Sequence, residues 1–292
     1  MPEAVPEVVS EVAPEAASVP VTAPAPAELA AGGDRASALR RLAGSRRLRR
    51  ILAVAGAFAI WQGLAVRSTS PLLPGVDTTV ERLADDIGSG LVWRHAQVTL
   101  LRGGIGLALA IVIGVGLGVL MARSRLVESA IEPLLASTYP VPKLALYPIF
   151  LLWLGLGAQS KIALVTLECL YPIAYNTYSG AKAVSRAQMW AALNAGASRL
   201  RIIWSVVLKS SLPSILTGIR IALPIAMVVM VVTELMGESL GLGFLIRQAG
   251  TRFQPEGALA IVLLLGVFGF VLDRLLVAAT RVLAFWEKEA EL

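Results

Sequence analysis

The chain has 292 residues, of which 56% are hydrophobic, with a mean hydropathy of +0.72 and a formal net charge of +6. Because several apolar runs approach the ~20 residues needed to cross hydrocarbon, this composition excludes an ordinary soluble domain and predicts an all-α membrane protein. One cysteine excludes an intramolecular disulfide, and one histidine cannot build a histidine metal cluster. No Walker A loop and no Gly-x-Gly-x-x-Gly motif occurs, so we expect no cofactor.

The first 50 residues form a tail of two parts. Residues 1–33 are a low-complexity mixture of Pro, Ala, Val and Glu without aromatics, which predicts disorder, and they lack the basic start and apolar core of a signal peptide. Seven arginines between positions 35 and 50 then lead into the first apolar run, which indicates a cytoplasmic amino terminus. We therefore predict a division into a tail, 1–50, and a transmembrane domain, 51–292.

Six apolar segments are predicted to cross the membrane. They are about 51–66, 98–122, 133–154, 161–179, 214–236 and 257–276, the last continuing as a helix past the membrane. With this layout, 17 of the 26 Lys and Arg residues lie on the side of the amino terminus and six on the other. Since cytoplasmic loops carry the excess of positive charge, both termini are predicted to be cytoplasmic.

The third segment contains three prolines within nine residues, Pro140, Pro142 and Pro148. Freed carbonyls at membrane depth are tolerated only where protein or a water-filled cavity satisfies them. The segment is therefore either a broken helix inside the assembly that lines a path, or a kink between packed helices, and the sequence leaves both open.

The second segment is rich in glycine, which allows neighbouring helices to approach closely. We expect packing to be the role of these glycines. Gly114, Gly116 and Gly118 are predicted to spread around the helix instead of forming one stripe. Cys169, inside the fourth segment, is predicted to be a small buried side chain.

The segment 180–213 has five basic residues and no acidic one. It contains a short helix pattern in which Ser185 is a candidate N-cap and Gly196 a candidate C′ residue. Ala191 and Ala192 leave one side of this helix nearly smooth. Such a helix either docks into a groove on a soluble partner or rests on lipid headgroups.

The same segment resembles the cytoplasmic EAA loop of the inner-membrane permeases of binding-protein-dependent ABC importers. That loop reads Glu-Ala-Ala, three residues, Gly, and then about nine residues before an Ile-x-Leu-Pro-like stretch. The corresponding residues here are Trp190-Ala191-Ala192, Gly196 and Val206-Val207-Leu208-Lys209. Two positions depart from the pattern, since Trp190 stands where Glu is usual and Lys209 where Pro is usual.

More of the chain, from about 95 to 286, is similar to the branch of permeases for nitrate, taurine and aliphatic sulfonates. Four motifs in the order of that branch carry the resemblance. They are Pro142–Pro148 with Trp153–Gly157; Pro172-Ile173 with Asn176-Thr177 and Gly180; Leu212–Ile215 with Gly218, Arg220 and Ala222-Leu223; and Glu234 with Gly241-Leu242-Gly243.

The resemblance implies a type I ABC importer permease fold, with six transmembrane helices and a cytoplasmic coupling helix at about 185–200, in a bacterial inner membrane. It implies a non-catalytic subunit that pairs as a homodimer or with another permease, is surrounded by lipids and does not bind nucleic acid. Two ATP-binding subunits would contact Trp190, Ala191, Ala192 and Gly196. An extracytoplasmic binding protein would deliver a small anionic solute: a sulfonate, taurine, nitrate or an aromatic carboxylate.

Charged residues within the spans are candidates for the path, because such residues are costly in hydrocarbon. Lys143 is the best cation for an anion. Glu168 either lines the path or is a structural partner of Lys143 or Lys161, and we favour the structural role because a carboxylate repels an anion. Arg220 is predicted to meet headgroups or an ATPase, and Glu234 to hold the loop that follows it.

Two other classes of protein compete with this interpretation. A self-contained secondary transporter predicts internal repeats and a buried ion-coupling cluster, and neither is visible in the sequence. A membrane enzyme predicts clustered His, Cys or acidic residues near one membrane face, for which the chain offers one His and one Cys. The secondary transporter is kept as the alternative.

Overall fold

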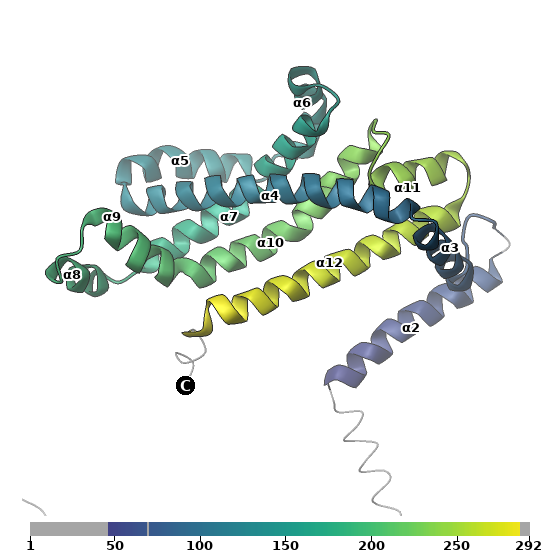
Figure 1. Ribbon diagram of the computed structural model, residues 1–292, viewed down its shortest axis with the longest axis horizontal. Coiled ribbons are helices and arrows are strands. Elements are labelled where there is room, and N and C mark those ends of the chain that lie inside the picture. Colours follow the sequence, from purple (N-terminus) through teal and green to yellow (C-terminus); the bar gives the residue numbers. More distant parts are fainter. Residues whose placement is uncertain (1–45, 69, 287–292) are drawn as a thin grey trace, which may run out of the picture. The chain divides into compact units, whose positions relative to one another are not determined.

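The computed structural model describes residues 46–68 and 70–286, and within these ranges the chain forms helices and no strands (Figure 1). The predictions for residues 1–33 and for the first arginines lie outside the described ranges. The helices in chain order are α2 (Arg46–Arg67), α3 (Val76–Gly88), α4 (Leu91–Arg123), α5 (Arg125–Thr138), the 3₁₀ turn η1 (Lys143–Leu146), α6 (Tyr147–Leu154), α7 (Ala158–Ala183), α8 (Arg186–Asn194), α9 (Arg199–Ile202), the π-helical turn η2 (Ile203–Val207), α10 (Leu208–Leu235), α11 (Leu242–Thr251) and α12 (Pro255–Leu283).

The chain divides into two compact units, residues 1–59 and 60–292, and each is described by itself. In the first unit the described residues, 46–59, are helical. The second unit begins with the end of α2, where Trp61 Nε1 donates to Pro74 O at 3.1 Å and Val76 N donates to Gln62 Oε1 at 2.6 Å. These two bonds fix the turn between α2 and α3.

The core of the second unit is built from α4, α7 and α10, which pack side by side (Figure 1). Glycines allow the close approach. A Cβ atom at Gly118 of α4 would lie 2.6 Å from Ala174 O, and one at Gly114 would lie 2.9 Å from Ile173 Cγ2, both on α7. The expectation that the α4 glycines spread around the helix is correct for Gly116, which faces open space, and wrong for Gly114 and Gly118, which share one packed face.

The third predicted span, 133–154, is interrupted at its prolines, as expected, and it is broken, not merely kinked. α5 begins at Arg125, after Ser124, whose side chain caps it by accepting from Val127 N. It ends at Thr138, and the chain then forms η1 and the eight-residue α6. The prolines therefore divide the segment into three short pieces, since proline removes the donor that a continuing helix needs.

Within the described ranges, four helical segments are long and apolar enough to cross a membrane: Leu48–Arg67, Leu91–Arg123, Arg199–Leu235 and Pro255–Leu283. They agree with the first, second, fifth and sixth predicted spans, each somewhat longer than expected. α7 has 26 residues, enough to span, but is not among the four, because Glu168, Asn176 and several tyrosines make it more polar. The number six therefore stays a prediction.

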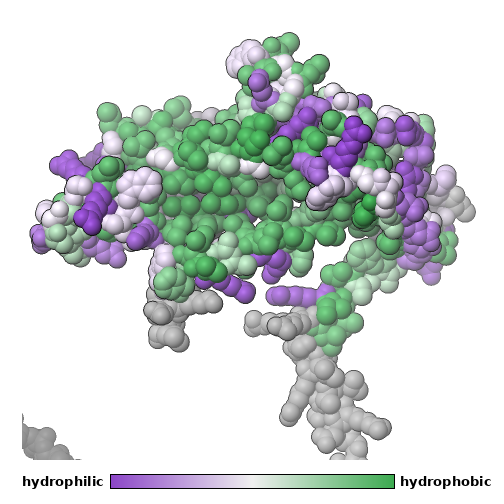
Figure 2. Space-filling model, viewed as in Figure 1, coloured by the Kyte–Doolittle hydropathy of each residue, from purple (hydrophilic) through white to green (hydrophobic). Residues whose placement is uncertain are grey.

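The surface of the second unit matches this assignment. On the face drawn in Figure 2, hydrophobic side chains cover the long helices, while hydrophilic ones gather around α8 and α9 at one end and around α3 and α11 at the other. A hydrophobic band between two hydrophilic ends is the pattern that a bilayer selects.

Candidate coupling helix and intramembrane charge pairs

The candidate coupling helix is α8, and local signals in the sequence define both of its ends. Ser185 is the N-cap, and its side chain accepts from Gln188 N at 3.3 Å. At the other end, Ala197 N donates to Ala192 O at 3.0 Å and Gly196 N donates to Leu193 O at 2.9 Å. This is a Schellman motif, and it requires the positive φ of 79° at Gly196. Both predicted caps are confirmed.

α8 turns one face to the protein and the other to solvent. Met189 and Ala192 pack on a small cluster that includes Ala181 and Ile202, and Arg123 Nη1 contacts Met189 Sδ at 2.6 Å. On the outer face, Ala191 is exposed and Trp190 is 63% exposed.

Gly196 also lies on the surface, and a Cβ atom there would meet nothing within 4 Å. The glycine is therefore required by its backbone conformation, and the space above it is free for another molecule.

α8 is joined to the core through short connections on both sides. Two residues, Val184 and Ser185, link it to α7. On the other side α9 continues through the π-helical turn η2 into α10 without a break, so residues 199–213, predicted to belong to the cytoplasmic segment, are part of one long helix. Single π turns within α-helices are frequent at functional sites.

The intramembrane charges predicted from the sequence lie in separate pairs. Lys143 Nζ lies 3.8 Å from Glu168 Oε2, which makes Glu168 a structural partner of Lys143, the alternative that the sequence favoured. Lys161, the other candidate partner, binds elsewhere. Whether Lys143 and Glu168 also line a path stays a prediction.

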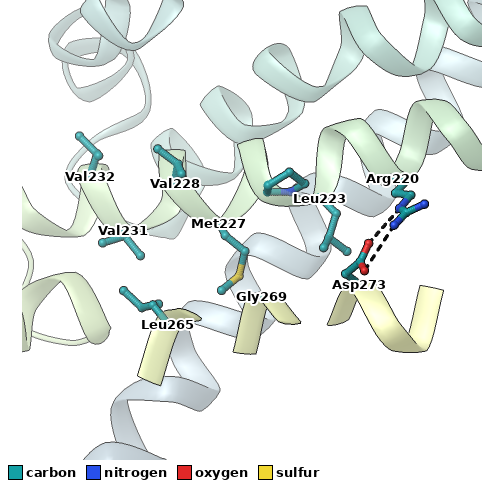
Figure 3. A pocket seen from close by; sticks show the side chains of 10 residues that line it. Arg220, Leu223, Met227, Val228, Val231, Val232, Leu265, Gly269 and Asp273 are labelled. Carbon is teal, nitrogen blue, oxygen red and sulfur yellow. Dashed lines mark hydrogen bonds and ion pairs between the residues drawn. The ribbon is translucent and has the colours of Figure 1, made fainter. Parts of the chain in front are cut away.

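Arg220 binds a partner that sequence reasoning did not identify. Its Nε donates to Asp273 Oδ1 of α12 at 2.9 Å, where headgroup or ATPase contact was expected. The pair closes one end of an apolar groove of about 530 Å³ between α10 and α12 (Figure 3). Leu223, Met227, Val228 and Leu265 are among the side chains that line it.

Glu234 holds the start of α11 and not merely a loop. Its carboxylate accepts from Gly243 N at 3.1 Å and from the Thr99 hydroxyl at 2.8 Å, and Thr99 in turn accepts from Leu242 N at 2.8 Å. The N-cap residue, Gly241, has no side chain, so α4 and α10 supply the capping groups from a distance. A Cβ atom at Gly241 would collide with the Glu234 carboxylate, which explains the glycine of this motif.

A second ion pair joins α7 to the loop after α10. Lys161 is 1% exposed, and its Nζ donates to Glu238 Oε1 at 2.7 Å and to Leu156 O at 3.0 Å. Arg102 Nη2 lies 3.7 Å from Glu238 Oε2. Although burial raises the pKa of the Glu238 carboxyl, the hydrogen bond and charge of Lys161 and the charge of Arg102 outweigh it and lower the pKa.

The candidate residues thus do not form one site. Trp190, Ala191 and Ala192 lie on α8, and Gly196 follows its end. Lys143 pairs with Glu168, and Arg220 pairs with Asp273, both away from α8. Among the described residues no group of three His, Cys, Asp or Glu side chains could hold a metal ion. Cys169 is fully buried, as predicted.

A family model described as "Binding-protein-dependent transport system inner membrane component" matches residues 110–282. The chain is 32% identical over 237 residues to the taurine transport system permease protein TauC of Escherichia coli (strain K12), covering 79% of this chain and 86% of TauC. It is 37% identical over 234 residues to the formylaminopyrimidine transport permease protein ThiX of Halalkalibacterium halodurans, covering 79% and 92% of the two chains.

The fold is similar to that of a chain in an inward-facing structure of the MetNI methionine ABC transporter. The TM-score is 0.54 at 19% sequence identity, and the match covers 66% of this chain and 94% of that one.

Proposed function

This chain belongs to the family of binding-protein-dependent transport system inner membrane components, and on that premise we propose that it is the membrane-spanning permease subunit of an ABC importer, driven through α8 by a separate ATPase. It is a multi-pass membrane protein of the same helical fold as the MetNI chain. The observation that carries the coupling role is the exposed outer face of α8, held between α7 and α10 by short connections. A displacement of this face by the ATPase would be transmitted directly to both α7 and α10.

The proposed assembly has two permease chains, two ATP-binding subunits and an extracytoplasmic binding protein. ATP binding and hydrolysis would bias the helices between two arrangements open to opposite sides. The chain itself would be non-catalytic. The solute would be a small anion, with a sulfonate the first candidate, since one relative is named for taurine; another is named for a formylaminopyrimidine.

The coupling role is tested by two glutamates placed in matched backbone positions. Gly196 and Gly90 both have positive φ, 79° and 75°, and a Cβ atom at either would meet nothing within 4 Å. Gly196→Glu is expected to insert in the membrane normally and to lose co-purification with the ATPase, whereas Gly90→Glu retains it. Normal co-purification of Gly196→Glu would refute docking on α8.

The proposed topology, with α8 and both termini in the cytoplasm, is tested by thiol labelling in intact cells. Because the one native cysteine, Cys169, is buried, the background is low. We expect a membrane-impermeant maleimide to label Ser89→Cys and to leave Ala187→Cys unlabelled until the membrane is opened. The reverse pattern would place α8 outside.

An ABC importer permease and a secondary transporter differ in their solute uptake in reconstituted vesicles. With the ATPase and the binding protein present, we expect uptake only when ATP is supplied, and none by this chain alone. Uptake by the chain without the ATPase would refute the proposal.

Candidate solutes come from thermal-shift screening of the binding protein against taurine, other sulfonates, nitrate, aromatic carboxylates and formylaminopyrimidine.

A further inference from the structure

Four of the five tyrosines in the sequence lie in one row, which we call the tyrosine row: Tyr139, Tyr171, Tyr175 and Tyr178. The centroids of successive rings are 4.4, 5.7 and 6.4 Å apart. Tyr171, Tyr175 and Tyr178 follow one another at helical spacing on a single face of α7, and Tyr139 joins them from the end of α5. The row therefore extends along one face of α7.

The row lies deep in α7 and not only at its ends. α7 has 26 residues, about 39 Å of helix; Tyr171 falls in its middle third, and Tyr175 lies one turn further along. Tyrosines of membrane helices normally gather at the two interfaces. Polar groups at mid-membrane depth instead face protein or a water-filled cavity, and they commonly mark a substrate path.

Three of the four hydroxyl groups have no hydrogen-bond partner in the part of the chain that the structure describes. Tyr178 donates to Glu128 Oε1 at 2.6 Å. Among the described residues, the hydroxyls of Tyr139, Tyr171 and Tyr175 form no hydrogen bond, and the rings of Tyr139 and Tyr175 are 61% and 47% exposed. The row thus presents three unpaired hydroxyls on the open side of α7, each able to donate to a passing oxyanion.

Each end of the row carries an ammonium group that is already neutralised. At one end Lys143 pairs with Glu168, one turn from Tyr171, and at the other Lys182 pairs with Glu128 at 2.5 Å. Another carboxylate, Glu132, also lies on α5 near Tyr178. The row therefore cannot attract an anion by net charge and would bind it only through hydroxyl donors and the positive ring edges. Weak, repeated binding of this kind suits conduction, which requires that a solute also leave.

We propose that the tyrosine row lines the translocation path, and that the hydroxyls of Tyr139, Tyr171 and Tyr175 bind the oxyanion group, sulfonate or carboxylate, of the solute in transit. This inference rests on the proposed transport function. It assigns the path to the open face of α7 and gives the solute a chemical class that fits the sulfonate candidate.

The path is tested by cysteine accessibility in the full chain in proteoliposomes. The probe is (2-sulfonatoethyl) methanethiosulfonate, which carries a sulfonate and reacts with water-exposed thiolates. The matched control is Val112→Cys, a 73% exposed position among apolar neighbours in the middle of α4. We expect Tyr175→Cys to react at least about tenfold faster than Val112→Cys, because a thiol facing hydrocarbon does not ionise. Tyr171→Cys provides a second position if Tyr175→Cys does not fold. Equal rates at the row and at Val112 would overturn the assignment of the path.

The role of the hydroxyls is tested by comparing this reagent with its trimethylammonium counterpart. In a background of Tyr139→Phe and Tyr171→Phe, the preference of Tyr175→Cys for the anionic reagent is expected to fall about three- to tenfold, because two hydrogen-bond donors are lost. Tyr147→Phe, which removes the buried hydroxyl that donates to Thr233 O, is the control and should change nothing. An unchanged preference would overturn the oxyanion role.

Co-purification of the same variants with the ATPase, together with their ATP hydrolysis, tests the proposed ABC function separately from the path. Normal assembly with unreactive row cysteines would refute the path and leave the proposed function standing. Reactive row cysteines in a chain that binds no ATPase would support a path and refute the proposed ABC function.

Discussion

The packing of α4 on α7 leads to a quantitative prediction for two glycines two residues apart. In Gly118→Ala the new Cβ would lie 2.6 Å from Ala174 O and 2.6 Å from Thr177 Cβ, whereas ordinary contact begins at 3.4 Å. The helices must therefore separate by about 0.8 Å, because a backbone carbonyl cannot rotate away; overpacking of this kind costs about 1–3 kcal/mol. In Gly116→Ala the Cβ meets nothing within 4 Å, and only the gain in helix propensity remains, at most about 1 kcal/mol.

The two variants lie two residues apart on the same helix and carry the same change of composition. Since both gain equally in helix propensity, the difference between them isolates the cost of separation, about 1–3 kcal/mol. Thermal unfolding in detergent should place the melting temperature of Gly118→Ala about 2–12 °C below that of Gly116→Ala. Equal melting temperatures would refute the claim that the Gly118 face is packed against α7.

Three further variants test other contacts. Lys161→Met should lower the free energy of unfolding by about 3–5 kcal/mol, because it leaves the Glu238 carboxylate without its buried partner; a loss below about 1 kcal/mol in chemical denaturation would contradict the pair. Folding lowers the pKa of Glu238 from its ordinary value of 4.5, so its contribution is present above that pH and lost as the pH falls below it. The melting temperature of the wild type should therefore fall more steeply than that of Glu238→Gln in acid, and parallel curves would count against this assignment. Ser185→Ala removes the N-cap of α8, at a cost of about 1 kcal/mol, and should speed hydrogen exchange at the Gln188 amide several-fold, with unchanged exchange contradicting the cap.

Features set by neighbouring residues were predictable from the sequence. The ends of α8 depend on Ser185 and Gly196, whose effects reach only three or four residues along the chain, and both were identified. The four most apolar spans were identified for the same reason, since length and hydropathy are local.

Features set by distant residues were not predictable. Lys161 binds Glu238, 77 positions away, and Arg220 binds Asp273, 53 positions away, and no spacing rule connects either pair. Packing of the α4 glycines was expected, but the face that Gly114 and Gly118 share was missed because Gly116 was grouped with them. Gly106, Gly114 and Gly118 are spaced in multiples of four residues, the spacing of a packing ridge along a helix, and this spacing could have identified the face.

The core helices are joined to each other at both of their ends, and this bears on how a push at α8 would be transmitted. At the end near α8, Gly180 of α7 packs so closely on Ser214 of α10 that a Cβ atom would lie 2.6 Å from the Ser214 Cβ. At the far end, the Lys161–Glu238 pair ties α7 to the loop that follows α10. Separating the two helices would break a buried ion pair and open a close-packed contact, whereas moving them together breaks neither. α8 lies in the chain between α7 and α10, so a displacement of α8 is expected to move both as one body.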